Sequence, residues 1–364
     1  MSIAKHRLQN QRLVGARFNA PEAVVRWLGA VQAQDYHSAK WALALRSHRT
    51  TEAGVEKAFN AGAILRVHAM RPTWHFVAPA DLRWMLALTS PRVHVANAHM
   101  YRKLELDEAL FHRVAGIFTA ALQGGRTLTR KELADILERE GIPARGQRLA
   151  YVVMQAELSG LLCSGPLHGK QHTYALVDER IPVAPPLSRD EALAALAHRY
   201  FTSHGPASVR DFAWWSGLTV SDAKLGVELV RPDLQRVIID GNTYWTGTCT
   251  GSAETADPIV HLLPNYDEHV VAYKDHSHTI DPAARDALRI RTDRPLDVHL
   301  VMRNGLIVGG WRRTLEKRRC VVKVDMLIEP RPDEQAALEQ AAADYATFLG
   351  LPVELALSER QNLQ

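Results

Sequence analysis

The chain has 364 residues, of which 46% are hydrophobic and 23% charged, and its formal net charge is +4. These values are typical of a globular protein with roughly two to four domains and exclude a largely disordered chain. No apolar run approaches membrane-spanning length, and the basic start lacks an apolar segment, so we expect no signal peptide, no membrane contact and a cytoplasmic location. The cysteines Cys163, Cys249 and Cys320 lie far apart, which predicts reduced core thiols rather than a disulfide scaffold or zinc finger.

Positive charge is concentrated in two stretches of the sequence. Residues 1–50 contain eight Lys and Arg but two acidic residues, and residues 303–319 contain six Lys and Arg. Clustered cations suit the phosphate backbone of a nucleic acid. A solvated basic surface is the alternative, and charge alone does not decide between the two.

The first predicted unit consists of three helices and a hairpin. Apolar residues at helical spacing predict a helix over 21–31, and a short helix should follow at 38–46. Thr51 can cap a third helix that ends near residue 62. Residues 65–77 alternate between apolar and polar side chains, which predicts extended chain.

The same order of elements follows twice more. Thr129 and Glu132 form a capping box that opens a helix in the second copy, and residues 240–242 have strong type I′ turn chemistry in the third. In the second copy we predict helices over 107–122, 129–141 and 145–159 and a hairpin over 161–177. In the third copy we predict helices over 190–201, 208–215 and 221–230 and a hairpin over 236–245.

Three helices followed by a hairpin are typical of a winged helix-turn-helix, which places one helix in a DNA groove and its hairpin against the backbone. Winged helices also serve as protein-binding modules, so this alternative stays open for each copy. The predicted fold class is therefore mainly α with β (α+β), with three tandem winged helices. The corresponding segments are residues 1–95, 96–186 and 187–252.

The remaining segment, residues 253–364, is different in character. We predict strands over 259–263, 269–273, 298–302, 306–311 and 320–327, a long helix over 332–349 and a returning strand over 352–357. These elements favour a small β-barrel or curled sheet with one packed helix.

The common catalytic motifs are missing from the sequence, including HExxH, a phosphate-binding loop and a nucleophile elbow. His276 and His278 beside Asp275 resemble a metal pair, but a polar loop is the simpler interpretation, and we expect no metal and no cofactor. Residues 267–269, Asp-Glu-His, form a dense titratable cluster. It suits acid–base chemistry, a buried ion-pair network or a solvated strand end.

Gln32 and Gln34 are candidate site residues because they follow the predicted apolar helix directly. At a helix end both amides can aim into one cleft, although a polar helix end is the structural alternative. Asp35 comes next and is either a base or a helix cap, of which the cap is the simpler role.

Five segments resemble the AlkZ/YcaQ family of winged-helix DNA glycosylases. They are AVQAQD (30–35), MRPTWH (70–75), GPASVRDF (205–212), LLPNYDE (262–268) and GGWRR (309–313). The resemblance implies three tandem winged helices and a C-terminal β-barrel in a C-shaped DNA cradle. It also implies that Gln32 and Gln34 form the catalytic Gln-apolar-Gln motif. The family often has Arg-Gly-Thr-Leu-His where this chain has Arg71-Pro72-Thr73-Trp74-His75. Pro72 stiffens the wing, and Trp74 is bulkier than the leucine of the family pattern.

A site of amides limits the substrate, since glutamine is neither acid nor base near neutral pH. Ordinary glycoside cleavage needs a carboxylic acid, whereas an N7-alkylated guanine is a cation that leaves without a proton. We therefore predict a monofunctional glycosylase for cationic N-alkylpurines, in which Gln34 positions water and Gln32 hydrogen-bonds to the sugar or water. Asp267 is a supporting candidate. The open cleft implied by the resemblance would also accept bulky adducts and interstrand crosslinks.

The expected partner is double-stranded DNA with alkylated bases, bound by a monomer. Candidate contacts lie on the first wing, on the third helix of the second copy and on a C-terminal strand: Arg71, His75, Arg145, Arg148, Arg312 and Arg313. We expect at least one of Trp214 and Trp215 to lie in the core. The alternative functions are a non-catalytic DNA-binding protein or transcription regulator and a scaffold for protein partners.

Overall fold

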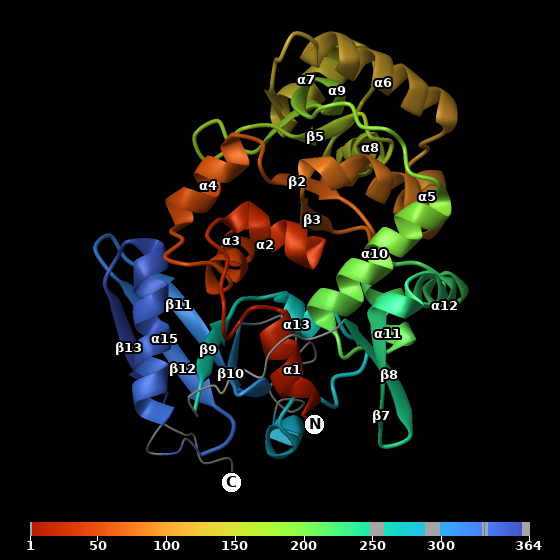
Figure 1. The fold of residues 1–364 in the computed structure, drawn as a ribbon. Coiled ribbons are helices and arrows are strands. Elements are labelled where there is room, and N and C mark those ends of the chain that lie inside the picture. Colours follow the sequence, from red (N-terminus) through yellow and green to blue (C-terminus); the bar gives the residue numbers. More distant parts are fainter. Residues whose placement is uncertain (1, 248–257, 288–298, 330, 332–333, 359–364) are drawn as a thin grey trace.

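The computed structural model describes residues 2–247, 258–287, 299–329, 331 and 334–358. Helices and small sheets alternate along the chain, so the fold is a mixture of α and β elements (Figure 1). Among the described residues, none of the helices has the length and apolar character that a membrane crossing requires.

The first unit has the predicted order of elements, with one helix before it, α1, and one strand within it, β1, that the sequence did not predict. Its elements are α1 (Ile3–Asn10), α2 (Pro21–Leu28), β1 (Ala30–Gln32), α3 (Tyr36–Leu45), α4 (Glu52–Asn60), β2 (Leu65–His68) and β3 (Trp74–Val77). The three strands form an antiparallel sheet in the order β1-β3-β2. The prediction of a helix over 21–31 is wrong at its end, because Gly29 adopts a φ of 84° and the chain turns into β1. Thr51 caps α4 as predicted.

The second unit follows a helix that the sequence did not predict. This helix, α5, has 25 residues, and the proposed boundary at 95/96 falls inside it. The capping box at Thr129 is confirmed at the start of α7. The elements are α5 (Pro79–Lys103), α6 (Glu108–Leu122), β4 (Leu128–Thr129), α7 (Arg130–Arg139), α8 (Gly146–Leu158), β5 (Leu162–Ser164), β6 (Thr173–Leu176) and α9 (Val177–Arg180).

The third unit matches its prediction most closely. Its elements are α10 (Arg189–His204), α11 (Val209–Ser216), α12 (Val220–Leu229), β7 (Leu234–Ile239) and β8 (Asn242–Gly247), with a 3₁₀ turn at Arg231–Asp233. Asp240 and Gly241 adopt φ values of 48° and 74° between the paired residues Ile239 and Asn242. Two positive φ values are what a type I′ turn requires, so this hairpin prediction is confirmed.

The C-terminal sheet has five strands in the order β13-β12-β11-β10-β9. Its elements are β9 (Val260–Leu263), α13 (Glu268–Val271), a 3₁₀ turn at Pro282–Ala284, β10 (Leu300–Arg303), β11 (Leu306–Leu315), β12 (Cys320–Met326), α15 (Glu334–Leu349) and β13 (Val353–Leu357). Over the described residues the edge strands β9 and β13 do not pair, so the predicted barrel is not closed. The strand predicted over 269–273 is wrong, because Asp267 caps the short helix α13 there.

Packing brings the first and third units together. One apolar core joins Leu65 and Val77 of the first sheet to Leu196 of α10 and Trp215 of α11. A second core joins Trp41 of α3 to the C-terminal sheet. Helix α3 packs against the C-terminal sheet, and β1 packs in the core shared with the third unit; Figure 1 shows α3 near the centre of the molecule.

The cysteines agree with the expected core positions where the structure describes them. Cys163 and Cys320 are buried and free. Burial raises the pKa of the Cys163 thiol to about 12, so it is not a reactive thiolate. Cys249 lies outside the described residues.

The cations that cluster in the first fifty residues do not form one surface patch. Arg7, Lys40 and Arg46 are buried. Lys40 pairs with Glu52 at 2.6 Å and Arg46 with Asp267 at 2.7 Å. Lys40 and Arg46 therefore form buried ion pairs, and the clustering of cations along the sequence does not predict where the basic surface lies.

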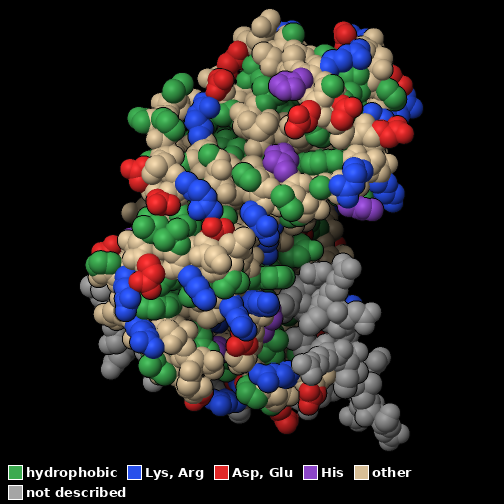
Figure 2. All heavy atoms as spheres, turned by 90° about the vertical axis from the view of Figure 1, so that its right-hand side faces the viewer, with side chains coloured by type: hydrophobic (Ala, Val, Ile, Leu, Met, Phe, Trp, Pro, Cys, Tyr) green, Lys and Arg blue, Asp and Glu red, His purple; other side chains and the backbone are tan. Residues whose placement is uncertain are grey.

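A basic surface lies elsewhere. Figure 2 shows Lys and Arg side chains gathered on the face that carries α10, α12 and the β7–β8 hairpin. Lys224 of α12 and Arg236 of β7 are exposed cations, as is Arg231 in the 3₁₀ turn between these two elements. Such a surface favours contact with a phosphate backbone.

Candidate functional site

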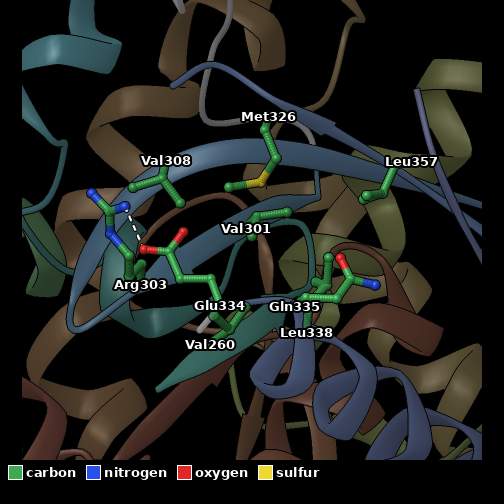
Figure 3. Close-up of a pocket in the computed structure, with 9 residues that line it drawn as sticks. All are labelled: Val260, Val301, Arg303, Val308, Met326, Glu334, Gln335, Leu338 and Leu357. Atoms are coloured by element: carbon green, nitrogen blue, oxygen red, sulfur yellow. Dashed lines mark hydrogen bonds and ion pairs between the residues drawn. The ribbon is translucent and has the colours of Figure 1, made fainter. Parts of the chain in front are cut away.

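The C-terminal unit contains a small cavity between its sheet and α15 (Figure 3). Its walls are largely apolar and include Val301, Val308 and Leu338, and Arg303 pairs with Glu334 at its side at 2.7 Å. A volume of about 20 Å³ holds one water molecule but no nucleobase. This cavity is a packing gap, and the candidate site is elsewhere.

Gln32 and Gln34 lie on and directly after a strand rather than at a helix end. Gln32 is the last residue of β1 and pairs with His75 of β3, and the Ala33 N–H donates to the Trp74 carbonyl at 2.7 Å. The strand ends at Gln32, and Gln34 lies in the bend between β1 and α3. Gln32 is buried and Gln34 is exposed, so the expectation that both amides face one cleft stays a prediction.

The Gln32 side chain is largely buried and held by an arginine. It is 8% exposed, and its Oε1 accepts a hydrogen bond from Arg71 Nη2 at 2.9 Å. Its backbone N–H donates to Glu268 Oε1 at 2.8 Å. Strand β1, the loop after β2 and helix α13 thus meet at this one residue.

Glu268 is a fully buried carboxylate beside the motif. Its Oε2 accepts the Trp215 indole N–H at 2.9 Å and lies 3.4 Å from His204 Nε2. Burial raises the pKa of this carboxyl, but the His204 side chain and the Gln32 N–H outweigh burial, so the pKa lies below its usual value. The group is a charged acceptor, with no proton to give near neutral pH.

Asp267 has a different environment from its neighbour. Its two oxygens accept from Arg46 at 2.7 and 2.8 Å, and its Oδ1 also accepts the His269 N–H at 2.9 Å. It is 1% exposed and makes no contact with Gln32 or Gln34. Of the interpretations offered for residues 267–269, the structure therefore favours a buried ion-pair network, and Glu268 rather than Asp267 reaches the motif.

Asp35 caps the following helix. Its side chain accepts from the Ser38 N–H at 3.1 Å at the start of α3. Burial raises the pKa of Asp35, but the hydrogen bonds from Ser38 outweigh it and lower the pKa below its usual value. The capping role is confirmed, and a carboxylate with a lowered pKa is a weak base.

Gln34 is the exposed member of the pair. Its Oε1 accepts the Trp74 N–H at 3.4 Å. Arg66 lies over the Trp74 ring, 4.2 Å from its centroid, and donates to the Ala33 carbonyl at 2.9 Å. Trp74, which the sequence marked as a departure from the family pattern, therefore borders the glutamine that faces solvent.

His75, one of the candidate DNA contacts, is a buried residue of the first sheet. It is 0% exposed, because β3 directs it into the protein, and its Nδ1–H donates to the Thr73 carbonyl at 3.0 Å. Burial lowers its pKa to about 3, so the imidazole is neutral. His75 Nε2 and Arg71 Nε are buried without a hydrogen-bond partner among the described residues.

The other predicted DNA contacts do not lie at the motif. Arg145 is exposed at the start of α8 and pairs with Glu138, and Arg148 donates to the Glu105 carbonyl at 3.4 Å. Arg312 is exposed on β11, whereas Arg313 donates to the Tyr345 hydroxyl at 2.6 Å. These positions leave Arg145 and Arg312 accessible to a large ligand.

Trp214 and Trp215 occupy opposite environments. Trp215 is 0% exposed and donates to Glu268, whereas Trp214 is 48% exposed. One tryptophan is therefore in the core, as expected. Sequence reasoning missed that Trp215, His204 and Glu268 meet beside Gln32, although Glu268 stands in one of the five family-like segments.

Comparison with known proteins identifies the fold and the family. The AlkZ-like DNA glycosylase family model matches residues 25–348. An interstrand DNA cross-link repair glycosylase of Streptomyces sahachiroi is 25% identical over 383 aligned residues, covering 96% of this chain and 97% of the relative. The solved structure of the Streptomyces sahachiroi DNA glycosylase AlkZ superposes with a TM-score of 0.77 at 22% identity, covering 97% of this chain and 98% of that one. Since the family model spans most of its length, the chain belongs to the AlkZ-like family of DNA glycosylases.

Proposed function

We propose that this enzyme is a monofunctional DNA glycosylase that hydrolyses the N-glycosidic bond of cationic N-alkylpurines, above all N7-alkylguanine. The observation that carries the proposal is a pair of amides, Gln32 buried and Gln34 exposed, next to a carboxylate whose oxygens already accept hydrogen bonds. Glu268 is fully buried and accepts hydrogen bonds from Gln32 and Trp215. No acid among the described residues that contact Gln32 can protonate a leaving base, so the base must already carry its positive charge.

The reaction is a substitution at C1′ of the deoxyribose. A water oxygen forms the new bond to C1′, the C1′–N9 bond breaks, and its electron pair neutralises the imidazolium ring of the departing base. The water loses one proton to solvent, because glutamine accepts none. We assign water positioning to Gln34, which is exposed, and hydrogen bonding to the sugar or the water to Gln32.

Hydrolysis by water, rather than a lyase reaction through a Schiff base, is supported by the lysine nearest the motif in sequence. Lys40 of α3 is buried between Glu52 and Glu56, with Nζ–Oε1 distances of 2.6 and 2.5 Å. A doubly paired ammonium is a poor nucleophile. Asp35 is occupied as the cap of α3, so we assign it no proton transfer.

We further propose that the three helix-and-hairpin units within residues 1–95, 96–186 and 187–252 act as winged helices that hold double-stranded DNA, together with the segment 253–364. Arg145, Arg148, Arg312 and Arg313 are the proposed backbone contacts, and a monomer suffices for this arrangement. The relative from Streptomyces sahachiroi is named as an interstrand cross-link repair enzyme. By analogy we propose that bulky adducts and crosslinks are also substrates.

The direct test is base release from a duplex that carries one N7-methylguanine, measured under single-turnover conditions. We expect release well above the spontaneous rate for the wild type. Gln34→Ala should lose roughly 100-fold in rate, the usual effect of removing one positioned polar group. Gln340→Ala, on helix α15, where the amide bonds only to Asp344 of the same helix, serves as the matched amide control. Wild-type activity equal to the spontaneous rate would contradict the proposal, and a specific gel shift on one DNA sequence would then favour the regulator.

A further inference from the structure

The orientation of the Gln32 amide follows from its partner. A guanidinium only donates hydrogen bonds, so the Gln32 atom that faces Arg71 Nη2 at 2.9 Å is the carbonyl oxygen. The NH2 group then lies at the other end of the amide. None of the described residues accepts a hydrogen bond from it, and it is absent from the buried polar atoms without a partner, so solvent reaches it.

Arg71 is itself fixed from several sides. Its guanidinium is largely buried, and burial lowers its pKa, whereas the charge of Glu268 raises it. The same Glu268 accepts the Gln32 N–H at 2.8 Å. Arg71 also lies 5.9 Å from the Trp214 ring centroid. Arg71 therefore donates to the Gln32 side chain, and Glu268, which accepts the Gln32 N–H, supplies a negative charge to its surroundings.

The loop that carries Arg71 is tightly wedged against α11. The Arg71 N–H donates to the Ala69 carbonyl at 2.6 Å, and the Thr73 N–H donates to the Arg71 carbonyl at 2.7 Å. Gly217, which ends α11 with a φ of 71°, leaves space for the Met70 carbonyl oxygen that any Cβ would overlap. The backbone of the Arg71 loop is therefore held closely against the end of α11.

We infer that Arg71 is a positioning residue which, with Glu268 as its counter-charge, holds Gln32 so that its NH2 group donates a hydrogen bond to an acceptor atom of the leaving purine. This inference rests on the proposed function and revises one part of it. An NH2 dipole is poorly suited to an oxocarbenium-like sugar, which attracts the negative end of an amide. It suits a purine acceptor, which gains electron density as the C1′–N9 bond breaks.

A donor to the purine and a donor to a phosphate predict different kinetics. The bond to the purine strengthens in the transition state, so its loss lowers the rate at saturating DNA. A bond to a phosphate oxygen is equally strong before and during the reaction, so its loss weakens DNA binding instead. An amide that stabilises the sugar cation through its oxygen predicts a third result, because a carboxylate in its place retains that role.

The test uses the full-length protein with Gln32→Glu, Gln32→Ala, Arg71→Lys and Arg71→Met, and with Arg83→Met as the matched control. Arg83 of α5 pairs with Asp178 and lies outside the site. Single-turnover rates at saturating DNA with N7-methylguanine and the Kd for undamaged DNA are measured for each variant. Gln32→Glu keeps a partner for Arg71 but removes the NH2 group, so it separates the two ends of the amide.

We expect Gln32→Glu and Gln32→Ala to lose the same factor in rate, roughly 100-fold, with Kd within threefold of the wild type. Arg71→Met should lose at least about tenfold in rate with an unchanged Kd, and Arg71→Lys should recover part of this loss. A Gln32→Glu enzyme within tenfold of the wild type would overturn the inference. So would an Arg71→Met enzyme that binds DNA more weakly but reacts normally once saturated.

A second measurement is independent of activity. In protein labelled with ¹⁵N-glutamine, the Gln32 side-chain NH2 signals are those that disappear in Gln32→Ala. We expect these signals to shift in Arg71→Met and to stay in place in Arg83→Met; unchanged signals in Arg71→Met would overturn the positioning role. If the wild type releases no N7-methylguanine, the proposed function fails, and the NMR comparison still decides whether Arg71 holds the Gln32 amide.

Discussion

Glu268 accepts the backbone N–H of Gln32 at 2.8 Å, although 236 positions separate the two residues in the sequence. Through this contact the helix α13 supports the strand that carries the glutamine motif. The same carboxylate accepts from Trp215 of α11. The candidate site therefore depends on three distant parts of the chain being packed together.

Removal of Glu268 should destabilise the protein. Glu268→Ala leaves two buried donors, the Gln32 N–H and the Trp215 indole N–H, without an acceptor, and it removes a negative charge near Arg71. We therefore expect the free energy of unfolding to fall by about 3–5 kcal/mol. Glu268→Gln, which keeps one acceptor oxygen, should lose less. Urea unfolding measures both, with Glu138→Ala, which removes an exposed partner of Arg145, as the control. Equal stabilities of Glu268→Ala and the control would show that the buried carboxylate is not a structural support.

The rate of base release should not depend on pH between 6 and 8. Near the motif, the pKa values of Asp35 and Glu268 lie below their usual range, and that of His75 is about 3. None of these groups changes its charge between pH 6 and 8, and the amides do not titrate. Single-turnover rates at saturating DNA should agree within about twofold across this range. A bell-shaped profile, or one ionisation near pH 6–7, would reveal an acid or base that this mechanism lacks.

Stability, in contrast, should fall in mild acid. Burial lowers the pKa of His75 to about 3 and of His261 and His269 to about 4, from an ordinary value of 6.5. Between these values the unfolded chain binds protons that the folded protein excludes. The stabilisation is therefore complete above pH 6.5 and is lost as the pH falls toward 4.

Each buried histidine contributes up to about 1.4 kcal/mol per pH unit in this window. We expect the free energy of unfolding, measured by urea titration, to be at least about 2 kcal/mol lower at pH 5 than at pH 7. His261→Gln should reduce this difference. Equal stability at the two pH values would mean that these imidazoles are charged in the folded protein.

Gly217 provides a test of the loop that holds Arg71. Gly217→Ala places a methyl group against the Met70 carbonyl, whereas Gly241→Ala, at a similar positive φ of 74°, meets no atom within 4 Å. Both variants carry the backbone strain of an alanine at positive φ, roughly 1–2 kcal/mol, so their difference isolates the clash. We expect Gly217→Ala to lose more stability and to release base more slowly. If the two variants behave alike in thermal unfolding and in base release, the close approach of the Met70 loop and α11 contributes to neither stability nor activity.

Local signals in the sequence were sufficient for much of the fold. The capping box at Thr129, the cap at Thr51 and the turn at Asp240-Gly241 each fix an element through neighbouring residues, and all three are present. The pattern at 21–31 failed because β1 is defined by pairing with β3, more than forty residues away. The prediction of a strand over 269–273 was also wrong, because the apolar residues at 270–273 resemble a buried strand although this segment begins with the helix α13.

The candidate site could be located from the sequence but not assembled. The motif at 32–34 is visible in the sequence, and the cap at Asp35 is a local feature. The partner of Gln32 is Glu268, and the partner of Arg46 is Asp267; such long-range pairs leave no local pattern. The direction in which His75 points depends on the register of β3 against β1 and β2, which one sequence does not reveal.

A site of amides should release only bases that already carry a positive charge before the C1′–N9 bond breaks. The most direct measurement compares base release from two duplexes that differ in one lesion, N7-methylguanine in one and the neutral 1,N6-ethenoadenine in the other. We predict enzyme-dependent release of N7-methylguanine that Gln34→Ala slows roughly 100-fold, and no release of the neutral base above the spontaneous rate. Comparable release of both bases would contradict the claim, because the neutral base needs an acid that this site does not provide.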